Sequence, residues 1–329
     1  MSVRDKVLRL LEIHRGEVLS GEWIAERLSV SRASVWKAVR ALRNEGHRIG
    51  AASRRGYRME SDNDILSEEG IRACLSEGSP VCGVVCLASV DSTNTYAKDL
   101  ALSGAGHGTL VVADQQTAGR GRRGRSFFSP AGTGLYMSLI LRPRVELERF
   151  QAVTVAAAVA VCRTVEVLTR CRPRIKWVND LFMSGPDGAE RKVCGILTEA
   201  VSDVESGAIE SVIVGIGLNV STREFAPELR TVAGSLFPEG VCRNRLAAGI
   251  AERLMDYQGR LGDPELIRGY RERSLLLGRD VRYLRDGVEC RGRALDIDEQ
   301  GSLVLRDEAG ETVVLRSGEV YAVRPEPEV

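Results

Sequence analysis

The chain has 329 residues, of which 43% are hydrophobic and 28% charged, and its formal net charge is +1. This composition is typical of a soluble protein with two or three domains. The longest apolar run, residues 152–161, is shorter than the roughly 18–20 residues of a membrane span, and residues 1–10 lack a signal-peptide pattern. We therefore expect a cytoplasmic protein without membrane association. Eight separate cysteines and three histidines predict reduced thiols and no zinc site.

Positive charge is concentrated at the N-terminus. Residues 1–60 contain 13 Lys and Arg against 7 Asp and Glu, a formal charge of +6, so the rest of the chain carries −5. A compact basic module on a mildly acidic body indicates that the first part meets a polyanion.

Three helices are predicted in this basic module. Apolar residues recur at helical spacing over residues 3–11, Ser20 can cap a second helix, and Ser31 can cap a third over residues 32–45. Because residues 29–31 alone separate the second and third helices, the spacing is that of a helix-turn-helix. Two short strands at 46–49 and 56–59, on either side of a basic turn, predict a wing.

The third helix and the wing supply the candidate DNA contacts. The outward residues of the helix reach base edges when such a helix enters the major groove, and arginines at the wing tip reach phosphates or a minor groove. These candidates are Arg32, Ser34, Lys37, Arg40, Arg54 and Arg55. Since one helix and one wing read only a short half-site, we expect specific binding to require a dimer. The alternative is a helical interaction domain with a solvated basic face.

The central part predicts an α/β or α+β domain, because apolar strand patterns alternate with helical ones after a polar linker at 61–64. Strands are expected at 84–90, 109–113, 135–141, 192–200 and 211–220. A helix capped by Asp91 or Ser92 should run to residue 102, and a longer one should span 150–168. A short strand ends in the polar cluster at 174–180, whose residue types can bind Mg²⁺ and polar ligand groups.

The most informative segment is GRGRRGR at 119–125, where arginines and glycines interleave. Glycine allows backbone N–H groups to converge on one point, and arginine supplies permanently charged forks for phosphate. The loop is therefore a candidate cradle for a nucleotide. It is neither a Walker loop nor a dinucleotide fingerprint, since no Gly-Lys-Ser/Thr follows and no strand feeds a helix there. By composition alone, an RNA-binding tract fits almost as well.

The C-terminal part changes from helices at 243–259 and 264–274 to short alternating strands at 280–284, 288–297, 303–306 and 312–315. Turns at 285–287, 300–301 and 309–310 separate these strands. The pattern predicts a small β-barrel.

Five stretches together resemble the biotin–protein ligase family, in the family's order: DSTN at 91–94, GRGRRGR at 119–125, KWVND at 176–180, KVCGIL at 192–197 and GIGLN at 215–219. The resemblance covers nearly the whole chain and includes the winged helix of the bifunctional repressor type. It implies an α/β (α+β) protein with a winged helix-turn-helix at 1–62. A class II synthetase-like mixed-sheet catalytic domain would follow at 63–275, and an SH3-like β-barrel at 276–329.

The resemblance implies an ATP-dependent, AMP-forming ligase that uses Mg²⁺ to make biotinyl-5'-AMP and transfers biotin to a lysine of a biotin carboxyl carrier protein. The adenylate would also be the corepressor of a homodimer on operator DNA that controls biotin synthesis genes. Two positions depart from the family: Val178 stands where proline is usual, and Phe127 where tryptophan is frequent.

Site residues carried over by position fall into overlapping sets. Biotin is assigned Ser92, Thr93, Asn94, Gln116, Gly119, Arg120, Arg122, Lys192, Gly195, Leu197 and Gly217. ATP is assigned Arg120, Arg122, Phe127, Lys176, Asn179 and Asn219. Catalysis is assigned to Lys192, Arg122 and Asp180, and Asp180 is also the expected Mg²⁺ ligand.

Three alternatives stay open on the sequence. A lipoate or octanoate ligase shares the implied fold, but its arginine-arginine-glycine-glycine-glycine signature is absent. A ligand-sensing transcription factor would bind without reacting, although Arg122, Asp180 and Lys192 argue for chemistry. A general RNA-binding protein fits the arginine loop but not the near-neutral net charge.

Overall fold

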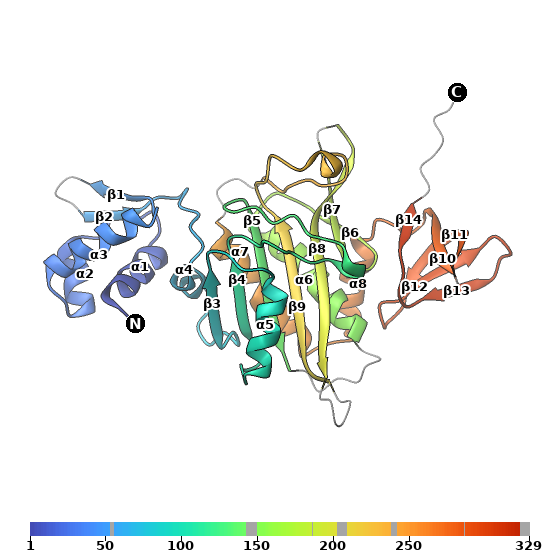
Figure 1. The fold of residues 1–329 in the computed structure, drawn as a ribbon, viewed down its shortest axis with the longest axis horizontal. Helices are drawn as coiled ribbons and strands as arrows, with labels where there is room; N and C mark the ends of the chain where they lie inside the picture. Colours follow the sequence, from blue (N-terminus) through green and yellow to red (C-terminus); the bar gives the residue numbers. More distant parts are fainter. Residues whose placement is uncertain are drawn as a thin grey trace.

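The computed structural model describes all residues except 53–55, 143–149, 186, 203–208, 238–241, 286 and 323–329. An N-terminal helical unit, a central sheet and a C-terminal set of strands follow one another along the long axis of the molecule (Figure 1). This order agrees with the mixed fold class expected from the sequence.

The N-terminal unit is the predicted winged helix-turn-helix, except that the first wing strand begins at Ile49 and does not cover the expected residues 46–48. It consists of α1 (Val3–Ile13), α2 (Gly21–Leu28), α3 (Arg32–Asn44) and the hairpin β1 (Ile49–Ala52) and β2 (Gly56–Met59). Ser20 and Ser31 cap α2 and α3, because their hydroxyls accept hydrogen bonds from backbone N–H groups three residues later, at 3.0 and 3.1 Å. Arg54 and Arg55, predicted at the wing tip, lie outside the described residues.

The central domain is built on a seven-stranded mixed sheet with the order β3-β4-β5-β9-β8-β7-β6. Its strands are β3 (Gly83–Leu87), β4 (Thr109–Ala113), β5 (Gly134–Leu141), β6 (Arg174–Lys176), β7 (Asp180–Ser184), β8 (Glu190–Ser202) and β9 (Ile209–Asn219). β3 and β4 are parallel, and the other neighbours are antiparallel.

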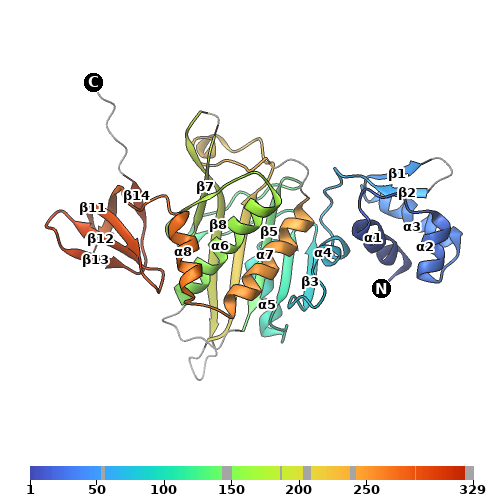
Figure 2. The same ribbon diagram turned by 180° about the vertical axis from the view of Figure 1, so that it is seen from behind.

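Helices cover both faces of this sheet (Figures 1 and 2). α5 (Thr93–Leu102) lies on one face, over β4, β5 and β9, and α6 (Phe150–Leu168), α7 (Arg243–Gln258) and α8 (Pro264–Glu272) pack on the other. Among the described residues, one stretch, Gln151–Leu168 of α6, is long and apolar enough to cross a membrane, so it exceeds the expected run at 152–161. Because 72% of this stretch is buried inside the fold, it has the burial of a core helix.

α4 (Glu68–Cys74) was not predicted, and it lies where the first two units meet. α1 packs against α4, and α4 packs against α7. With seven residues, α4 is too short for its apolar spacing to stand out in the sequence. Its single fully buried apolar side chain, Ile71, belongs to the central core.

The predicted linker at 61–64 is held on both sides. Arg15 Nη1 donates to the Asn63 carbonyl at 2.8 Å, and Asn63 Oδ1 accepts from the Arg48 backbone N–H at 2.9 Å. On the other side, Arg243 binds both carboxylate oxygens of Asp64, at 2.7 and 2.8 Å. Side-chain hydrogen bonds from both units therefore fix the position of this predicted polar linker.

The C-terminal unit is a five-stranded antiparallel sheet with the order β13-β12-β11-β10-β14. Its strands are β10 (Asp280–Arg285), β11 (Val288–Ile297), β12 (Leu303–Asp307), β13 (Thr312–Leu315) and β14 (Val320–Ala322). The first four match the predicted strands, and β14 was missed because three residues give no readable alternation. Closure into an SH3-like barrel stays an expectation.

Candidate functional site

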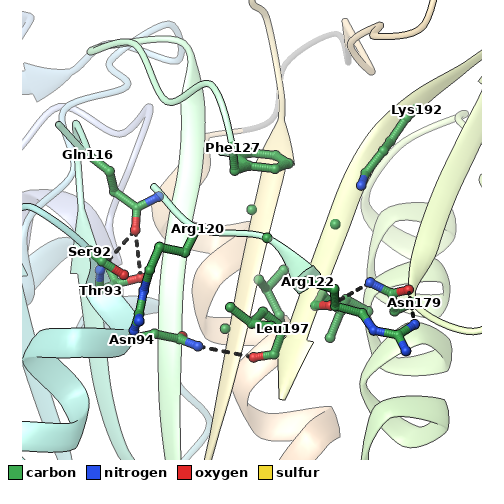
Figure 3. Close-up of a pocket in the computed structure, with 16 residues that line it drawn as sticks. Ser92, Thr93, Asn94, Gln116, Arg120, Arg122, Phe127, Asn179, Lys192 and Leu197 are labelled. Carbon is green, nitrogen blue, oxygen red and sulfur yellow. Dashed lines mark hydrogen bonds between the residues drawn. The ribbon is translucent and has the colours of Figure 1, made fainter. Parts of the chain in front are cut away.

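A cavity opens where α5 begins, beside β8 and β9 and beneath the glycine–arginine loop. Figure 3 shows Ser92, Thr93, Asn94 and Gln116 on one side, Arg122, Asn179 and Lys192 on the other, and Phe127 between them. The lining residues are Ser92, Thr93, Asn94, Gln116, Arg120, Gly121, Arg122, Phe127, Asn179, Lys192, Gly195, Ile196, Leu197, Gly215, Ile216 and Gly217.

Glycines form the floor of this cavity. Gly195 and Gly217 pair with each other on the neighbouring strands β8 and β9. A β-carbon on Gly217 would lie 2.5 Å from Cε1 of Phe127, and one on Gly195 would lie 3.1 Å from Nζ of Lys192. A β-carbon on Gly215 would collide with Oδ1 of Asn94. The ring of Phe127 therefore rests directly on the backbone at Gly217, which only a residue without a β-carbon allows.

One side of the cavity is a hydrogen-bonding end. Gln116 Oε1 accepts from the backbone N–H and the hydroxyl of Thr93, at 2.9 and 3.1 Å, and Gln116 Nε2 donates to Ser129 Oγ at 2.9 Å. Ser138 Oγ lies 2.8 Å from Thr93 Oγ1. Ser92 is the N-cap of α5, yet its hydroxyl makes no capping hydrogen bond and is available to a ligand.

The carboxylate of Glu199 binds the polar and cationic side chains at this end of the cavity. It accepts from Asn94 Nδ2 at 2.7 Å and pairs with Lys98 at 3.0 Å and Arg120 at 3.4 Å. Burial opposes ionisation of Glu199, but the hydrogen bonds from Asn94 and Lys98 outweigh it and lower the pKa of the carboxyl group. The ionised carboxylate thereby fixes the orientation of Asn94 and Arg120.

The opposite side is a cationic end. Arg122 Nη1 donates to Asn179 Oδ1 at 3.1 Å, and Asn179 Nδ2 donates to the Ile196 carbonyl at 2.8 Å. Burial lowers the pKa of Arg122, and the nearby charge of Arg123 lowers it further. An anion bound here would relieve both penalties on the arginine.

Lys192 completes the cationic end. Its Nζ lies 2.7 Å from Oδ1 of Asp180, at the start of β7. Lys176, on β6, stands outside the cavity lining, with its Nζ over the ring of Tyr321 at 4.4 Å from the ring centroid. Burial lowers the pKa of Lys176, and the charge of Lys192 adds to this effect while Asp180 opposes it.

Four predicted site residues do not line the cavity: Gly119, Lys176, Asp180 and Asn219. Gly119 packs behind the loop, where a β-carbon would lie 2.5 Å from the Phe127 carbonyl oxygen. Asn219 shares one face of β9 with Gly215 and Gly217, because side chains on a strand alternate. Its Nδ2 donates to the Gly234 carbonyl at 3.0 Å, whereas its buried Oδ1 has no partner among the described residues. A buried oxygen without a hydrogen-bond partner indicates that a donor group of a ligand binds there.

Sequence reasoning missed Ser129, Ser138, Glu199 and Glu319. Glu319 comes from the C-terminal unit and pairs with Arg125 at 2.6 Å and Arg123 at 3.7 Å, so that unit contacts the glycine–arginine loop. Glu199 had one readable signal, since it is an acidic residue within the apolar strand β8. The other three are ordinary polar residues whose role no local pattern in the sequence indicates.

On the winged helix, the predicted DNA contacts are distributed unevenly. Arg32, Lys37 and Arg40 are exposed on α3. Ser34 is only half-buried, and its backbone N–H and its hydroxyl both bond to the capping Ser31, at 3.1 and 2.9 Å. Three of the four predicted helix contacts are therefore free to meet a polyanion.

Comparison with known proteins identifies the family of this chain. The Bifunctional ligase/repressor BirA of Bacillus subtilis is 35% identical over 318 residues, covering 94% of this chain and 95% of the relative. The chain belongs to the biotin–protein ligase family. The Biotin--[acetyl-CoA-carboxylase] ligase of Mycobacterium tuberculosis is likewise 35% identical over 249 residues, which is 72% of this chain and 88% of the relative.

Family models and a solved structure agree with this membership. The Biotin/lipoate A/B protein ligase family matches residues 86–219, an HTH domain matches 3–58, and the Biotin protein ligase C terminal domain matches 276–322. The biotin protein ligase from Aquifex aeolicus, solved in complex with biotin and ATP, superposes with a TM-score of 0.62 at 28% identity, covering 74% of this chain and 100% of that one. Because the C-terminal match names biotin ligases alone, a lipoate ligase is not favoured.

Proposed function

We propose that this chain is a biotin–protein ligase that activates biotin with ATP to biotinyl-5'-AMP and transfers biotin to a lysine of a biotin carboxyl carrier protein. Its helix-turn-helix domain makes it also a biotin-responsive repressor. The observation that carries the proposal is the two-ended cavity, with neutral hydrogen-bonding groups and the ion-paired Arg120 on one side and the cations Arg122 and Lys192 on the other. Biotin has the same two ends, because its ureido ring is neutral and polar and its valeryl chain ends in a carboxylate.

The hydrogen-bonding end fits the ureido ring. Ser92, Thr93 and Gln116 offer the donors and acceptors that its carbonyl and two N–H groups require. Arg122 and Lys192 would meet the carboxylate at the other end. Phe127 and the unpartnered Oδ1 of Asn219 fit adenine, which presents a flat ring and an exocyclic amino donor.

Adenylation joins two anions. A carboxylate oxygen of biotin attacks the α-phosphorus of ATP, the phosphoanhydride bond breaks, and pyrophosphate leaves. Arg120, Arg122 and Lys192 screen the repulsion between the reactants and stabilise the charge that develops on the phosphoryl oxygens. A cavity rich in fixed cations and poor in acid–base pairs suits this step, since no proton moves in it.

Mg²⁺ would arrive with the phosphates of ATP, as the ion usually binds through one or two carboxylates and substrate oxygens. No group of three His, Cys, Asp or Glu side chains that could hold a metal alone occurs in the described part of the chain. The carboxylate of Asp180, beside Lys192, would supply one ligand oxygen. The ion would neutralise phosphate charge.

Transfer requires a neutral amine. The neutral Nζ of the acceptor lysine attacks the acyl carbon of the adenylate, the bond between this carbon and the phosphate oxygen breaks, AMP leaves with the electron pair, and the proton on the new amide nitrogen passes to water. Asp180 lies at the cationic end and would orient this amine, because its carboxylate already accepts an ammonium group, that of Lys192.

The deciding experiment incubates the protein with biotin, Mg²⁺ and α-labelled ATP and follows pyrophosphate release and protein-bound adenylate. We expect adenylate with biotin, none with lipoate, and loss of the signal in Lys192→Ala. Adenylate with lipoate would instead identify a lipoate ligase, and no adenylate with either acid would leave a DNA-binding sensor.

The repressor function is tested separately. We expect biotin and ATP together to promote homodimers in sedimentation and to tighten binding to operator DNA, because a dimer presents two recognition helices to paired half-sites. Unchanged sedimentation and DNA affinity would contradict this part of the proposal and leave the ligase part standing.

A further inference from the structure

The exposed face of α3 carries a tryptophan, Trp36, as well as cations. Phosphate binding by the cations does not explain why an aromatic side chain lies there. Trp36 is the fifth residue of α3, and 51% of its surface is exposed. It stands four residues after Arg32 and four before Arg40, so the three side chains form one stripe along the helix. Because tryptophan is usually well buried, the exposure of Trp36 requires an explanation.

Packing in the core of the N-terminal domain does not explain the position of Trp36. The inner face of α3 is occupied by Val35, Ala38, Val39 and Leu42, which are buried. Trp36 points away from them, and its ring contacts a guanidinium group. Carbon Cζ of Arg40 lies over the indole, 5.4 Å from the ring centroid.

This stacking orients the indole on the exposed face. A guanidinium over a tryptophan ring is attracted to its π-face by about 0.5–1 kcal/mol at exposed sites, which favours one ring orientation. Arg43, the next cation along the helix, donates its Nε to the Ile49 carbonyl at 2.9 Å and is held by the wing strand. Trp36 is therefore the large apolar surface among Arg32, Lys37 and Arg40, at the part of the helix that enters a groove.

We propose that Trp36 is a specificity residue that recognises thymine by covering its C5 methyl group in the major groove, with Arg40 holding the indole in place. The inference rests on the proposed operator binding and deepens it. Base pairs present hydrogen-bond donors and acceptors in the major groove, and the thymine methyl is the apolar group among them. Arg32 and Lys37, on the same face, serve the phosphates that position the helix.

The test begins with selection of duplexes from a random pool. The full chain, with biotin, ATP and Mg²⁺, is used as wild type and as Trp36→Ala. The duplex preferred by the wild type is then synthesised with thymine or deoxyuridine at each selected thymine, since uracil lacks only the methyl group.

We expect uracil at one such position in a single half-site to weaken wild-type binding about threefold to fivefold, the effect of losing one buried methyl group. Trp36→Ala should bind both duplexes equally, and Trp36→Phe should retain part of the discrimination. Indole emission should also change on binding of the thymine duplex.

Trp23→Ala is the matched control. Trp23 is 38% exposed in the same domain, but it lies on α2 and packs edge-on against His14 with ring centroids 5.4 Å apart. This variant should keep the discrimination between thymine and uracil. Adenylate formation should be unchanged in both alanine variants, because neither tryptophan lines the cavity.

Equal wild-type affinity for the two duplexes, or the same discrimination in Trp36→Ala as in the wild type, would overturn the assignment while leaving operator binding intact. If the wild type enriches no sequence, the repressor proposal fails, and the assignment of Trp36 falls with it.

Discussion

At the scale of single residues, Arg122 and Arg123 are neighbours with different surroundings. Arg122 lines the cavity and bonds to Asn179, whereas Arg123 lies 3.7 Å from Glu319 of the C-terminal unit. Of the two, only Arg122 lies in the cavity and is proposed to meet the reacting phosphate. We expect Arg122→Ala to slow adenylate formation about 10²–10³-fold, the usual loss when one group that stabilises developing charge is removed.

Arg123→Ala is the control for that prediction, and its effect should stay within about tenfold. Single-turnover pyrophosphate release measures both variants. Equal losses would mean that the loop acts through its total charge, and the separate role given to Arg122 would then be wrong.

Asn219 offers a second prediction at this scale. Its Oδ1 is buried without a partner among the described residues, and we propose that it accepts a hydrogen bond from the exocyclic amino group of adenine. Asn219→Ala should raise the KM for ATP about tenfold, the usual scale of one hydrogen bond, and leave biotin binding unchanged. Titration with biotin alone is the internal control, and a parallel loss of biotin affinity would refute the assignment.

At the scale of elements, β14 and the segment before it connect the C-terminal unit to the glycine–arginine loop. Glu319 pairs with Arg123 and Arg125 and accepts a hydrogen bond from Tyr321. These ion pairs should restrict the conformations that the glycine–arginine loop can adopt. We expect Glu319→Ala to raise the KM for ATP about fivefold, as for loss of a partly exposed ion-pair cluster. Glu311→Ala, which removes an exposed carboxylate of the same unit, should have no effect in the same kinetic assay.

The N-terminal domain should have its own pH dependence. His47 is buried, and burial lowers its pKa, so the folded domain favours the neutral ring. The unfolded chain binds the proton first as pH falls through about 6.5. The free energy of unfolding of this domain should therefore decrease from pH 7.5 to 5.5. Hydrogen exchange of α1 and β1 amides measures this decrease, which His47→Gln should flatten; an unchanged slope would exclude His47 as the cause.

Elements with a regular apolar period were predicted best from the sequence. The predicted bounds of α6, β4, β11 and β13 are those observed, because each has a clear period and a polar boundary. α4, β7 and β14 were not predicted, because their sequences show no regular apolar period, and they form because neighbouring elements cover them. In the site, motif positions predicted the glycine floor and the lining cations. The positions of the buried Ser138 and the half-buried Glu199 depend on strand register, which no local pattern specifies.

At the scale of the whole molecule, the junction between the DNA-reading domain and the central domain depends on Arg15 and Arg243. Arg15 pairs with the buried carboxylate of Glu12 and donates to the Asn63 carbonyl at 2.8 Å. Arg15→Ala would leave Glu12 buried without its counter-charge. We expect it to lower the free energy of unfolding of the N-terminal domain by about 2–3 kcal/mol and to loosen the domain from α4.

Small-angle scattering and limited proteolysis near residue 62 measure this loosening, and adenylate formation should persist because the cavity is formed by other elements. Arg27→Ala, at an exposed position on α2, is the matched control and should leave the scattering curve unchanged. Loss of adenylate formation in Arg15→Ala alone would show that the junction also shapes the catalytic site.

The glycine floor has a consequence for inhibitors of this enzyme. Drug resistance commonly arises when a pocket residue is exchanged for a larger one that blocks the compound. Here a β-carbon at Gly215 or Gly217 would strike Asn94 or Phe127 of the protein itself, so such a mutant would damage the enzyme before it excluded a compound. Few mutations of the floor glycines could therefore exclude a compound that binds against them and still leave an active enzyme. Escape mutations should then concentrate in the glycine–arginine loop, whose side chains are more exposed.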